Sequence, residues 1–398
     1  MKLSIRDLDL VRQRVFVRVD FNVPLKGGVI GDDTRIRASL PTIRYALDQG
    51  GTVVLASHLG RPKGKPVPDM SLRPVADRLA DLLERPVLFA TDCVGSEARG
   101  AVTEAHGARD RKLVLLENLR FHPEEEKNDA AFAQQLAELA DRYVDDAFGA
   151  AHRAHASVEA VTHFVKRPAA GLLMEQELQY LGHALEAPER PFVAILGGAK
   201  VSDKIDVIQN MLGRVDRLLV GGAMAYTFFK ARGIDVGRSL VEDEKLEEAR
   251  QIEASAAKSR VQFELPVDHV VTDRIEPGTI NEVLPIASSA IGNRMGVDIG
   301  PATIKRYEAA IADAKTVVWN GPMGVFEIEA FAAGTSAVAR AVAAVKGTTI
   351  IGGGDSIAAV KKAGIEDRIT HISTGGGASL EFLGGRTLPG VAALEEKR

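Results

Sequence analysis

Cysteine and long hydrophobic runs are both scarce in this chain. Its 398 residues contain a single cysteine, Cys93, so no disulfide can form within the chain, which fits a reducing compartment. No run approaches the roughly 18 apolar residues that span a bilayer, and the N-terminal MKLSIRDLDL lacks the apolar stretch of a signal peptide. We therefore expect a cytoplasmic protein. No basic neighbour or helix start activates the Cys93 thiol, so we expect it to be passive.

Two well-known nucleotide-binding signatures are also missing. Neither GxxxxGK[ST] nor GxGxxG occurs, and a dehydrogenase would show the second with an acidic residue about 20 positions further on. The formal net charge is −4, whereas a nucleic-acid-binding protein usually carries a broadly basic face. We therefore expect neither nucleic acid nor a membrane among its partners, and the dehydrogenase class is disfavoured.

Length and composition are those of a globular protein with two cores. A chain of 398 residues exceeds the usual ceiling for one core, and 45% hydrophobic and 26% charged residues are ordinary. Strand-like apolar runs alternate with helical patterns, which indicates right-handed βαβ units and a parallel sheet. The first four runs are Val15–Asp20, Thr52–Ser57, Leu113–Glu117 and Tyr143–Asp146.

Helical patterns lie between these runs. One has Pro41 at its expected first turn, and the next has apolar residues at 3.6-residue spacing and Ser71 as its expected N-cap. An amphipathic helix from Met174 to about Glu186 is ended by two prolines, and we interpret it as the connection between lobes. The alternation then restarts. We predict an α/β protein with two doubly wound, Rossmann-like parallel-sheet lobes and a cleft between them.

Each strand of the first half adjoins a loop that carries an unpaired basic side chain. In a parallel α/β sheet such loops meet beyond the carboxyl ends of the strands, where ligands bind. Cations gathered there would repel one another unless an anion filled the crevice, and the arginine fork suits a phosphate. The residues concerned are Arg35, His58, Arg61, Arg120 and Arg153. His152 and His155 flank the last of these, but no third ligand stands at zinc spacing, so we do not expect zinc.

Strand ends of the second half are rich in glycine instead. The segments ILGGAK, LLVGGAM, WNGPMG, IIGGGDS and ISTGGG suit backbone N–H groups that wrap phosphates. Lys200 lies at the first of these turns and Lys204 one helical turn later, where the helix dipole disfavours a cation unless an anion sits between the two. A pair of solvated surface lysines is the alternative. The STGGG glycines suit either an anion nest or a simple tight turn.

Several oxygen-bearing side chains admit two interpretations each. Asp355, at an expected helix start, is either an N-cap or a ligand of a Mg²⁺ ion that bridges nucleotide phosphates. Glu327 is either an acceptor for ribose hydroxyls or a surface acid. Asp20 and Asn22 follow a buried strand, and they either orient substrate hydroxyls or stabilise a turn.

An arginine-lined site in one lobe and a glycine-lined site in the other favour phosphoryl transfer between two separately held substrates. A two-lobed anion-binding protein without chemistry is the main rival class. Such a protein would not need Lys200, Lys204 and Asp355 beside the glycines, and it would usually carry an export signal.

Eight motifs, in order along the chain, resemble those of phosphoglycerate kinases of bacterial type. They are RVDFNVP, SHLGRP, LLENLRF, DAFGAAHRAHAS, LGGAKVSDKI, WNGPMGVFE, GGGDS and STGGGAS. The resemblance extends from the first strand to the last helix. It implies a monomeric glycolytic enzyme that reversibly transfers the acyl phosphate of 1,3-bisphosphoglycerate to ADP, giving 3-phosphoglycerate and ATP, with Mg²⁺ as the companion of the nucleotide.

The resemblance also implies a role for individual residues. Arg35 and Lys200 would steady the phosphoryl group during transfer. The phosphoglycerate would be held by Asp20, Phe21, Asn22, Arg35, His58, Leu59, Gly60, Arg61, Arg120 and Arg153. The nucleotide would be held by Lys204, Gly296, Glu327, Gly353, Gly354, Asp355 and Ser356, with Asp355 on magnesium. Ala223 and Ala302 stand where glycine and lysine are frequent in the family, and either change would alter nucleotide affinity only slightly.

The same resemblance implies a domain division. Residues 1–173 would bind phosphoglycerate, 174–187 would form the interdomain helix, 188–378 would bind nucleotide, and 379–398 would return to the first domain. Because water would hydrolyse an acyl phosphate, we expect the lobes to close before transfer, with hinges in the 174–187 helix and after STGGG. The acyl phosphate has a good leaving group, so we expect no enzyme-bound phosphate and no dedicated general base.

Overall fold

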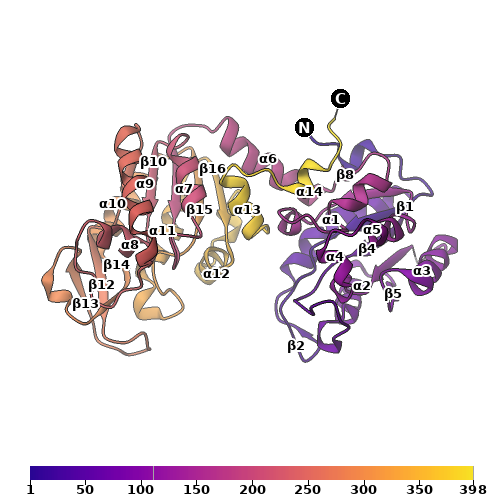
Figure 1. The fold of residues 1–398 in the computed structure, drawn as a ribbon, viewed down its shortest axis with the longest axis horizontal. Coiled ribbons are helices and arrows are strands. Elements are labelled where there is room, and N and C mark those ends of the chain that lie inside the picture. Colours follow the sequence, from indigo (N-terminus) through magenta and orange to yellow (C-terminus); the bar gives the residue numbers. More distant parts are fainter. Residues whose placement is uncertain (111, 398) are drawn as a thin grey trace. The chain divides into compact units, whose positions relative to one another are not determined.

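The computed structural model describes residues 1–110 and 112–397, and the chain divides into two compact units (Figure 1). Unit 1 comprises Met1–Gln179 and Thr387–Arg398, and unit 2 comprises Tyr180–Arg386. The division falls inside helix α6 (Leu172–Glu186). The chain returns to unit 1 at Thr387 rather than at residue 379, because α13 (Gly377–Leu383) packs with unit 2.

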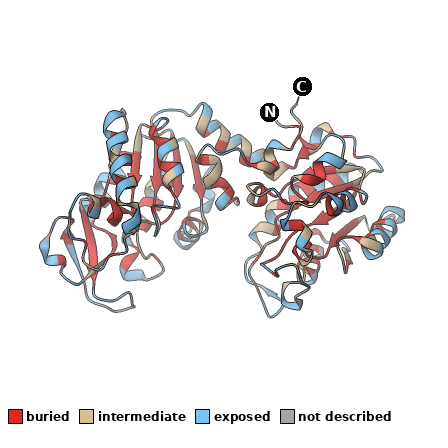
Figure 2. Ribbon diagram, in the orientation of Figure 1, coloured by how far each residue is buried: buried red, intermediate tan, exposed pale blue. Residues whose placement is uncertain are grey.

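Unit 1 is built on a six-stranded parallel sheet in the order β5-β6-β4-β1-β7-β8. The β4 run TVVLA is buried along its whole length, as expected for a strand covered on both faces. Figure 2 shows these strands buried and the outward sides of the surrounding helices exposed. The strands are β1 (Arg14–Arg18), β4 (Thr52–Ala56), β5 (Leu88–Ala90), β6 (Leu113–Leu116), β7 (Arg142–Asp145) and β8 (Ala169–Ala170).

The helices of unit 1 follow its strands as the alternating pattern predicts. A short hairpin of β2 (Leu25–Lys26) and β3 (Val29–Ile30) precedes the first of them. The helices are α1 (Thr34–Asp48), α2 (Arg73–Leu83), α3 (Gly95–Gly107), α4 (Pro123–Glu126), α5 (Ala130–Ala137) and α14 (Pro389–Ala392).

Three predicted helix starts are wrong by different amounts. Helix α1 begins at Thr34, whose N–H donates to the Asp32 carboxylate, and it runs through Pro41. Pro41 is exposed, so the bond that its missing N–H would have made lies on the outer side of the helix. Helix α2 follows Leu72 rather than Ser71. Helix α6 starts two residues before Met174, because the Asp146 carboxylate accepts N–H bonds from its first turn.

Unit 2 repeats the design with a second six-stranded parallel sheet, in the order β11-β10-β9-β15-β16-β17. Its strands are β9 (Phe192–Leu196), β10 (Arg217–Val220), β11 (Gln262–Glu264), β15 (Thr316–Asn320), β16 (Thr348–Gly352) and β17 (His371–Ile372). Besides α13, its helices are α7 (Ile205–Leu212), α8 (Met224–Ala231), α9 (Leu246–Lys258), α10 (Pro301–Ile311), α11 (Ala333–Ala344) and α12 (Gly354–Ala363). The predicted pair of doubly wound sheets is therefore confirmed.

A three-stranded antiparallel sheet in unit 2 was not predicted. Its order is β13-β12-β14, formed by β12 (Asp268–Thr272), β13 (Asn281–Pro285) and β14 (Met295–Ile299). The sequence of β13 hides the strand, because only one of its five residues is buried and the apolar alternation is lost. This sheet matters for the site because β14 carries Gly296.

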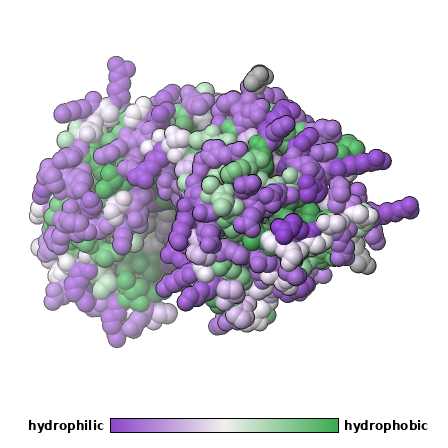
Figure 3. Space-filling model, turned by 45° about the vertical axis from the view of Figure 1, so that its right-hand side comes forward, coloured by the Kyte–Doolittle hydropathy of each residue, from purple (hydrophilic) through white to green (hydrophobic). Residues whose placement is uncertain are grey.

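The surface seen in Figure 3 is mostly hydrophilic, with hydrophobic residues in scattered patches. Within residues 1–110 and 112–397, no helix is both long enough and apolar enough to cross a membrane.

Candidate active site

The loops after β1 and β4 are fastened to each other in unit 1. Asn22 Oδ1 accepts a bond from the Gly60 N–H at 2.9 Å, and the Arg35 guanidinium donates to Asp20 Oδ2 at 2.8 Å. Gly60 adopts a φ of +63°, which an L side chain would strain. The alternative of a purely local turn does not account for Asp20 and Asn22, because Asn22 also bonds to the neighbouring loop.

The side chains of Phe21 and Leu59 are buried, and their backbone N–H groups bond to neighbouring segments. The Phe21 N–H donates to the Ser57 hydroxyl at 2.8 Å. The Leu59 N–H donates to Asn118 Oδ1 at 3.1 Å, and Asn118 Nδ2 returns a bond to the Leu59 carbonyl at 2.7 Å. Asn118 is fully buried and ties the β4 loop to the β6 loop. The backbone of the SHLGRP segment is therefore held in one conformation.

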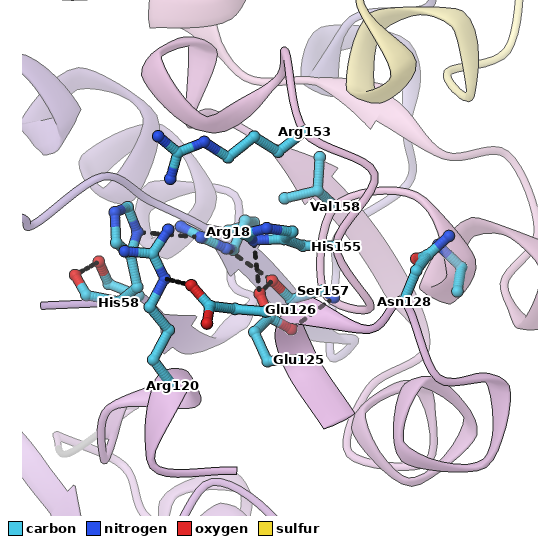
Figure 4. A network of polar contacts seen from close by, with 12 residues as sticks. Arg18, His58, Arg120, Glu125, Glu126, Asn128, Arg153, His155, Ser157 and Val158 are labelled. Atoms are coloured by element: carbon cyan, nitrogen blue, oxygen red, sulfur yellow. Dashed lines mark hydrogen bonds and ion pairs between the residues drawn. The ribbon is translucent and has the colours of Figure 1, made fainter. Parts of the chain in front are cut away.

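Arg120 and Arg153 bring two more cations to this region. Arg120 is 4% exposed, donates to the Gly60 carbonyl at 2.8 Å and lies 3.2 Å from Glu126 Oε1. Burial lowers the pKa of Arg120, and the proximity of Arg153 acts in the same direction. Arg153 Nε lies 3.0 Å from His152 Nε2. Figure 4 shows the guanidinium groups of Arg120 and Arg153 near the ring of His58.

His58 and His155 are both buried among cations. Burial, followed by Arg18, Arg120 and Arg35, lowers the pKa of His58 well below its ordinary value. Burial and the same kind of neighbours lower the pKa of His155 to about 3. Both rings are therefore neutral near pH 7. The shared repulsion also shows that the predicted cations of unit 1 converge.

Arg61 stands apart from the rest. Its side chain is exposed, and it forms no hydrogen bond or ion pair with any residue that the structure describes. The structure thus brings together Asp20, Asn22, Arg35, His58, Gly60, Arg120 and Arg153, while the exposed Arg61 has no hydrogen bond or ion pair, within the described parts of the chain, that ties it to them.

Sequence reasoning missed three residues at the centre of this network, namely Arg18, Glu125 and Ser157. Arg18 and Glu125 are fully buried, and Ser157 bonds to both side chains. Arg18 sits within a strand and Glu125 within an acidic run, so neither shows a pattern typical of a ligand. A charged residue inside the otherwise apolar run VFVRV was the signal that could have revealed Arg18.

Unit 2 contains two adjoining cavities at the carboxyl ends of its parallel strands. The larger has a volume of about 660 Å³ and the smaller about 250 Å³, and both are bounded by Gly198, Ala199, Pro322 and Asp355. The larger cavity is lined by charged side chains, among them Lys200, Lys204 and Asp355, and it lies at the starts of α7, α12 and α13. Three helix N-termini at one cavity favour an anion.

Lys204 faces the larger cavity as a buried cation. It precedes α7 directly, is 7% exposed and donates to Asn320 Oδ1. Burial lowers its pKa to about 8, with Asp203 and Asp355 acting in the opposite direction. Lys200 is exposed and lines the same cavity. Both lysines therefore line one cavity although α7 begins only after Lys204, and burial of Lys204 contradicts the alternative of two surface lysines.

Asn320 is a further cavity residue that the sequence did not reveal. It ends β15, and its Nδ2 is a buried donor without a partner among the described residues. Beside it, Gly353 has a φ of +88° and precedes α12. Buried donors in this state are rare unless a ligand or water accepts from them. The site thus offers an unused donor, Asn320 Nδ2, to an anion.

Asp355 is not the N-cap of α12. The helix begins at Gly354 with Gly353 as its N-cap, so Asp355 lies in the first turn, exposed, and it borders both cavities. The adjacent Ser356 is buried, and its hydroxyl accepts from the Gly321 N–H. One free carboxylate beside phosphate-sized space fits Mg²⁺, which commonly takes one or two carboxylates and otherwise phosphate oxygens and water.

The smaller cavity is largely apolar. Tyr226, Phe229 and Met323 line it together with the predicted residues Gly296 and Glu327. A Cβ at Gly296 would collide with the Tyr226 hydroxyl, so glycine is required there. Ala223, noted as a departure from the family pattern, also lines this cavity. The shape and lining suit a nucleoside next to its phosphates.

Cys93 is buried in unit 1, and burial raises the pKa of its thiol well above the usual range. This agrees with the predicted passive role. The Cys93 sulfur, Asp92 and His122 lie close enough to share a cation, but His122 Nε2 already bonds to Asp92 at 2.7 Å.

Comparisons with known proteins agree on one family. The family model described as Phosphoglycerate kinase matches residues 5–386. A protein of Solibacter usitatus named phosphoglycerate kinase is 59% identical over 99% of both chains. The solved phosphoglycerate kinase of Coxiella burnetii has a TM-score of 0.88 and 42% identity, covering 99% of this chain and 98% of that one. That of Pyrococcus horikoshii has a TM-score of 0.84 and 35% identity, covering 98% of each chain. The chain belongs to the phosphoglycerate kinase family.

Proposed function

We propose that the two units divide one reaction between them, with phosphoglycerate held by unit 1 and the nucleotide by unit 2. The reaction is that of the family, the reversible transfer of the acyl phosphate of 1,3-bisphosphoglycerate to ADP, which yields 3-phosphoglycerate and ATP in glycolysis. The observation that carries the assignment is the pair of adjoining cavities in unit 2. A space with charged side chains at three helix starts, beside a largely apolar space, matches the phosphates and nucleoside of one nucleotide.

In unit 1, the substrate anion would meet donors that are already in place. Arg120 and His58 are held by bonds to neighbouring groups, so little reorganisation accompanies binding. Arg35 is a third exposed and is paired with Asp20, which keeps its guanidinium at the edge of the site. We assign Arg35 and Lys200 to the phosphoryl group in transfer, because both are charged and accessible.

Phosphoryl transfer asks the protein mainly for positioning and charge neutralisation. The attacking oxygen belongs to the β-phosphate of ADP, which needs no deprotonation near pH 7, so we propose no general base. Asp355 would hold Mg²⁺, which neutralises charge on the phosphate oxygens when bound. We further propose that closure of the units excludes water during transfer. The monomeric state, the cytoplasmic location and the hinge positions stay predictions.

The decisive experiment is a coupled assay for ADP formation from ATP that depends on added 3-phosphoglycerate. Activity should require 3-phosphoglycerate and Mg²⁺ together, and 2-phosphoglycerate provides the matched substrate control. A protein that binds 3-phosphoglycerate without turning over ATP would be an anion-binding protein, and the proposed function would then be wrong.

A further inference from the structure

Arg18 lies at the centre of the unit 1 network, outside the set of residues assigned to substrate. It is the last residue of β1, and its side chain is fully buried. Its Nε donates to the Ser157 hydroxyl at 2.8 Å, its Nη1 donates to the Val19 carbonyl, and its Nη2 lies 3.2 Å from Nδ1 of His58 (Figure 4). Every nitrogen of the guanidinium therefore has a partner.

The contact with His58 has only one possible direction. A guanidinium carries five N–H donors and no acceptor, so Nδ1 of His58 must accept the bond with its lone pair. The neutral imidazole has a single ring proton, which must then reside on Nε2. The neutral state follows from burial and from the neighbouring guanidinium groups, which lower the pKa of His58.

Nε2 of His58 is left available on the opposite side of the ring. It bonds to no residue within 1–110 and 112–397, yet it does not belong to the fully buried polar atoms that lack a partner. It therefore stays accessible to a ligand. Because Nε2 carries the ring proton, it can donate a hydrogen bond to an anionic oxygen of a ligand.

The Arg18 guanidinium is itself held in place by Ser157, which is held in turn by Glu125. The Ser157 hydroxyl accepts from Arg18, so its own proton points to Glu125 Oε1 at 2.6 Å, and the Ser157 N–H donates to Glu125 Oε2 at 2.9 Å. Glu125 is fully buried in α4. The guanidinium cannot rotate without leaving buried polar groups unpaired, which is costly.

We propose that Arg18 is a positioning residue that fixes the tautomer of His58, so that the ring presents an Nε2–H donor to the anionic substrate. The network then acts as a chain of one-way hydrogen bonds, from Arg18 through Ser157 to Glu125 on one side and from Arg18 to His58 on the other. The benefit for the substrate rests on the proposed function, whereas the tautomer itself is a property of the free protein.

The test is the tautomer of His58, measured by NMR on full-length protein labelled in histidine and assigned with His58→Gln. The free protein should show the Nε2–H form, without titration between about pH 6 and pH 8. His106, whose Nδ1 lies 3.1 Å from the Thr52 hydroxyl, provides an internal reference in the same spectrum. A wild-type ring protonated on Nδ1 would overturn the proposal without any variant.

Variants of Arg18 provide the second part of the test. In Arg18→Met, His58 should lose its single tautomer, and KM for 3-phosphoglycerate should rise about tenfold with a smaller change in kcat, as expected for loss of one hydrogen bond to a charged group. Arg18→Lys keeps the charge and a donor, so partial recovery of tautomer and KM is expected. Arg14→Met, on the same strand but bonded to Asp141, is the matched control and should change neither.

A folded Arg18→Met protein that keeps the pure Nε2–H form would contradict the proposal, whatever its activity. If Arg18→Met fails to fold, Ser157→Ala loosens the same guanidinium and should broaden or split the His58 signals. Addition of 3-phosphoglycerate to the wild type separates the effect of Arg18 on the tautomer from the role of His58 in substrate binding. An Nε2–H tautomer whose signals ignore 3-phosphoglycerate would leave the role of Arg18 intact and refute the proposed role of His58 in substrate binding.

Discussion

In unit 1 the candidate site is made of charged side chains, whereas in unit 2 much of it is glycine backbone. Arg18, Arg120 and His58 are each at most 5% exposed and are held by hydrogen bonds. The larger cavity of unit 2 is bounded by seven glycines and by the starts of three helices. The same fold class therefore presents positive potential in two different ways.

The difference fits the ligands proposed for each unit. A small anion with a fixed shape can be met by a rigid array of guanidinium and imidazole groups, which also read its geometry. A flexible chain of phosphates is better met by many backbone N–H groups, which require close approach and hence no Cβ. We therefore expect removal of charge to be most damaging in unit 1, and addition of a methyl group to be damaging in unit 2.

The largest effect is expected for Arg35→Ala in unit 1. Loss of one preorganised donor to the transition state typically costs on the order of 3 kcal/mol, so kcat should fall about 100-fold or more, with a smaller change in KM. Steady-state kinetics measure both. Arg37→Ala, two residues along α1 and paired with Asp33 on the surface, is the control and should keep normal turnover. An unchanged kcat for Arg35→Ala would remove Arg35 from the chemistry.

Much of this comparison could be predicted from the sequence, because strand ends and glycine turns are local signals. The apolar runs that end at Asp20 and Ser57 predict buried strands, and parallel strands place their carboxyl ends at one edge of the sheet. The topology of a parallel sheet therefore predicts that the basic residues of unit 1 lie close together at one sheet edge, and that the glycines of unit 2 do the same. Individual roles came from the family resemblance, since local sequence left Asp355 equally suited to a cap.

The parts that could not be predicted depend on contacts between distant segments. Arg18 and Ser157 are 139 positions apart, and nothing local to either shows that they bond. Burial of Lys204 depends on Asn320, which belongs to another strand. Pro41 lies within a helix because its outer face is exposed, a property set by packing. In each case a tertiary contact overrode a local preference.

The second largest effect is expected for Asp355→Asn, which removes the carboxylate proposed to hold Mg²⁺ in unit 2. The affinity for Mg·ADP should fall on the order of 10- to 100-fold, as is typical when groups around a bound metal are altered. Titration calorimetry with ADP at several Mg²⁺ concentrations measures this. Asp367→Asn, on the exposed turn after α12, is the control. Wild-type affinity and rate in Asp355→Asn would exclude Asp355 as a metal ligand.

Gly353→Ala tests the backbone side of the comparison. At φ +88° and ψ +134° an alanine is strained, and its Cβ would lie 3.2 Å from the Asn320 side chain. Such strain costs on the order of 1–3 kcal/mol, so ADP should bind about tenfold more weakly. Gly213→Ala has an ordinary φ of −90° and lies outside both cavities, so it should bind ADP normally. Equal affinity in the two variants would contradict the close-approach argument.

The smallest expected effect is the pH dependence of ADP binding, which tests whether unit 2 also depends on the buried charge of Lys204. Burial lowers the pKa of Lys204 to about 8, so the ammonium form dominates at pH 7 and is about half populated at pH 8. If this form binds the phosphates, ADP affinity should decrease only about twofold between pH 7 and pH 8, and binding at pH 8 should take up about half a proton. The phosphate itself contributes little, since its last pKa is near 6.

Calorimetry at pH 8 in two buffers of different ionisation enthalpy measures that uptake. Lys204→Arg keeps the charge but does not titrate in this range, so the uptake should vanish while binding persists. Lys258→Arg, at the exposed end of α9, should behave as the wild type. Uptake that survives in Lys204→Arg would show that another group titrates. Unit 2 would then rely on backbone more completely than its buried lysine suggests, and the contrast with unit 1 would become sharper.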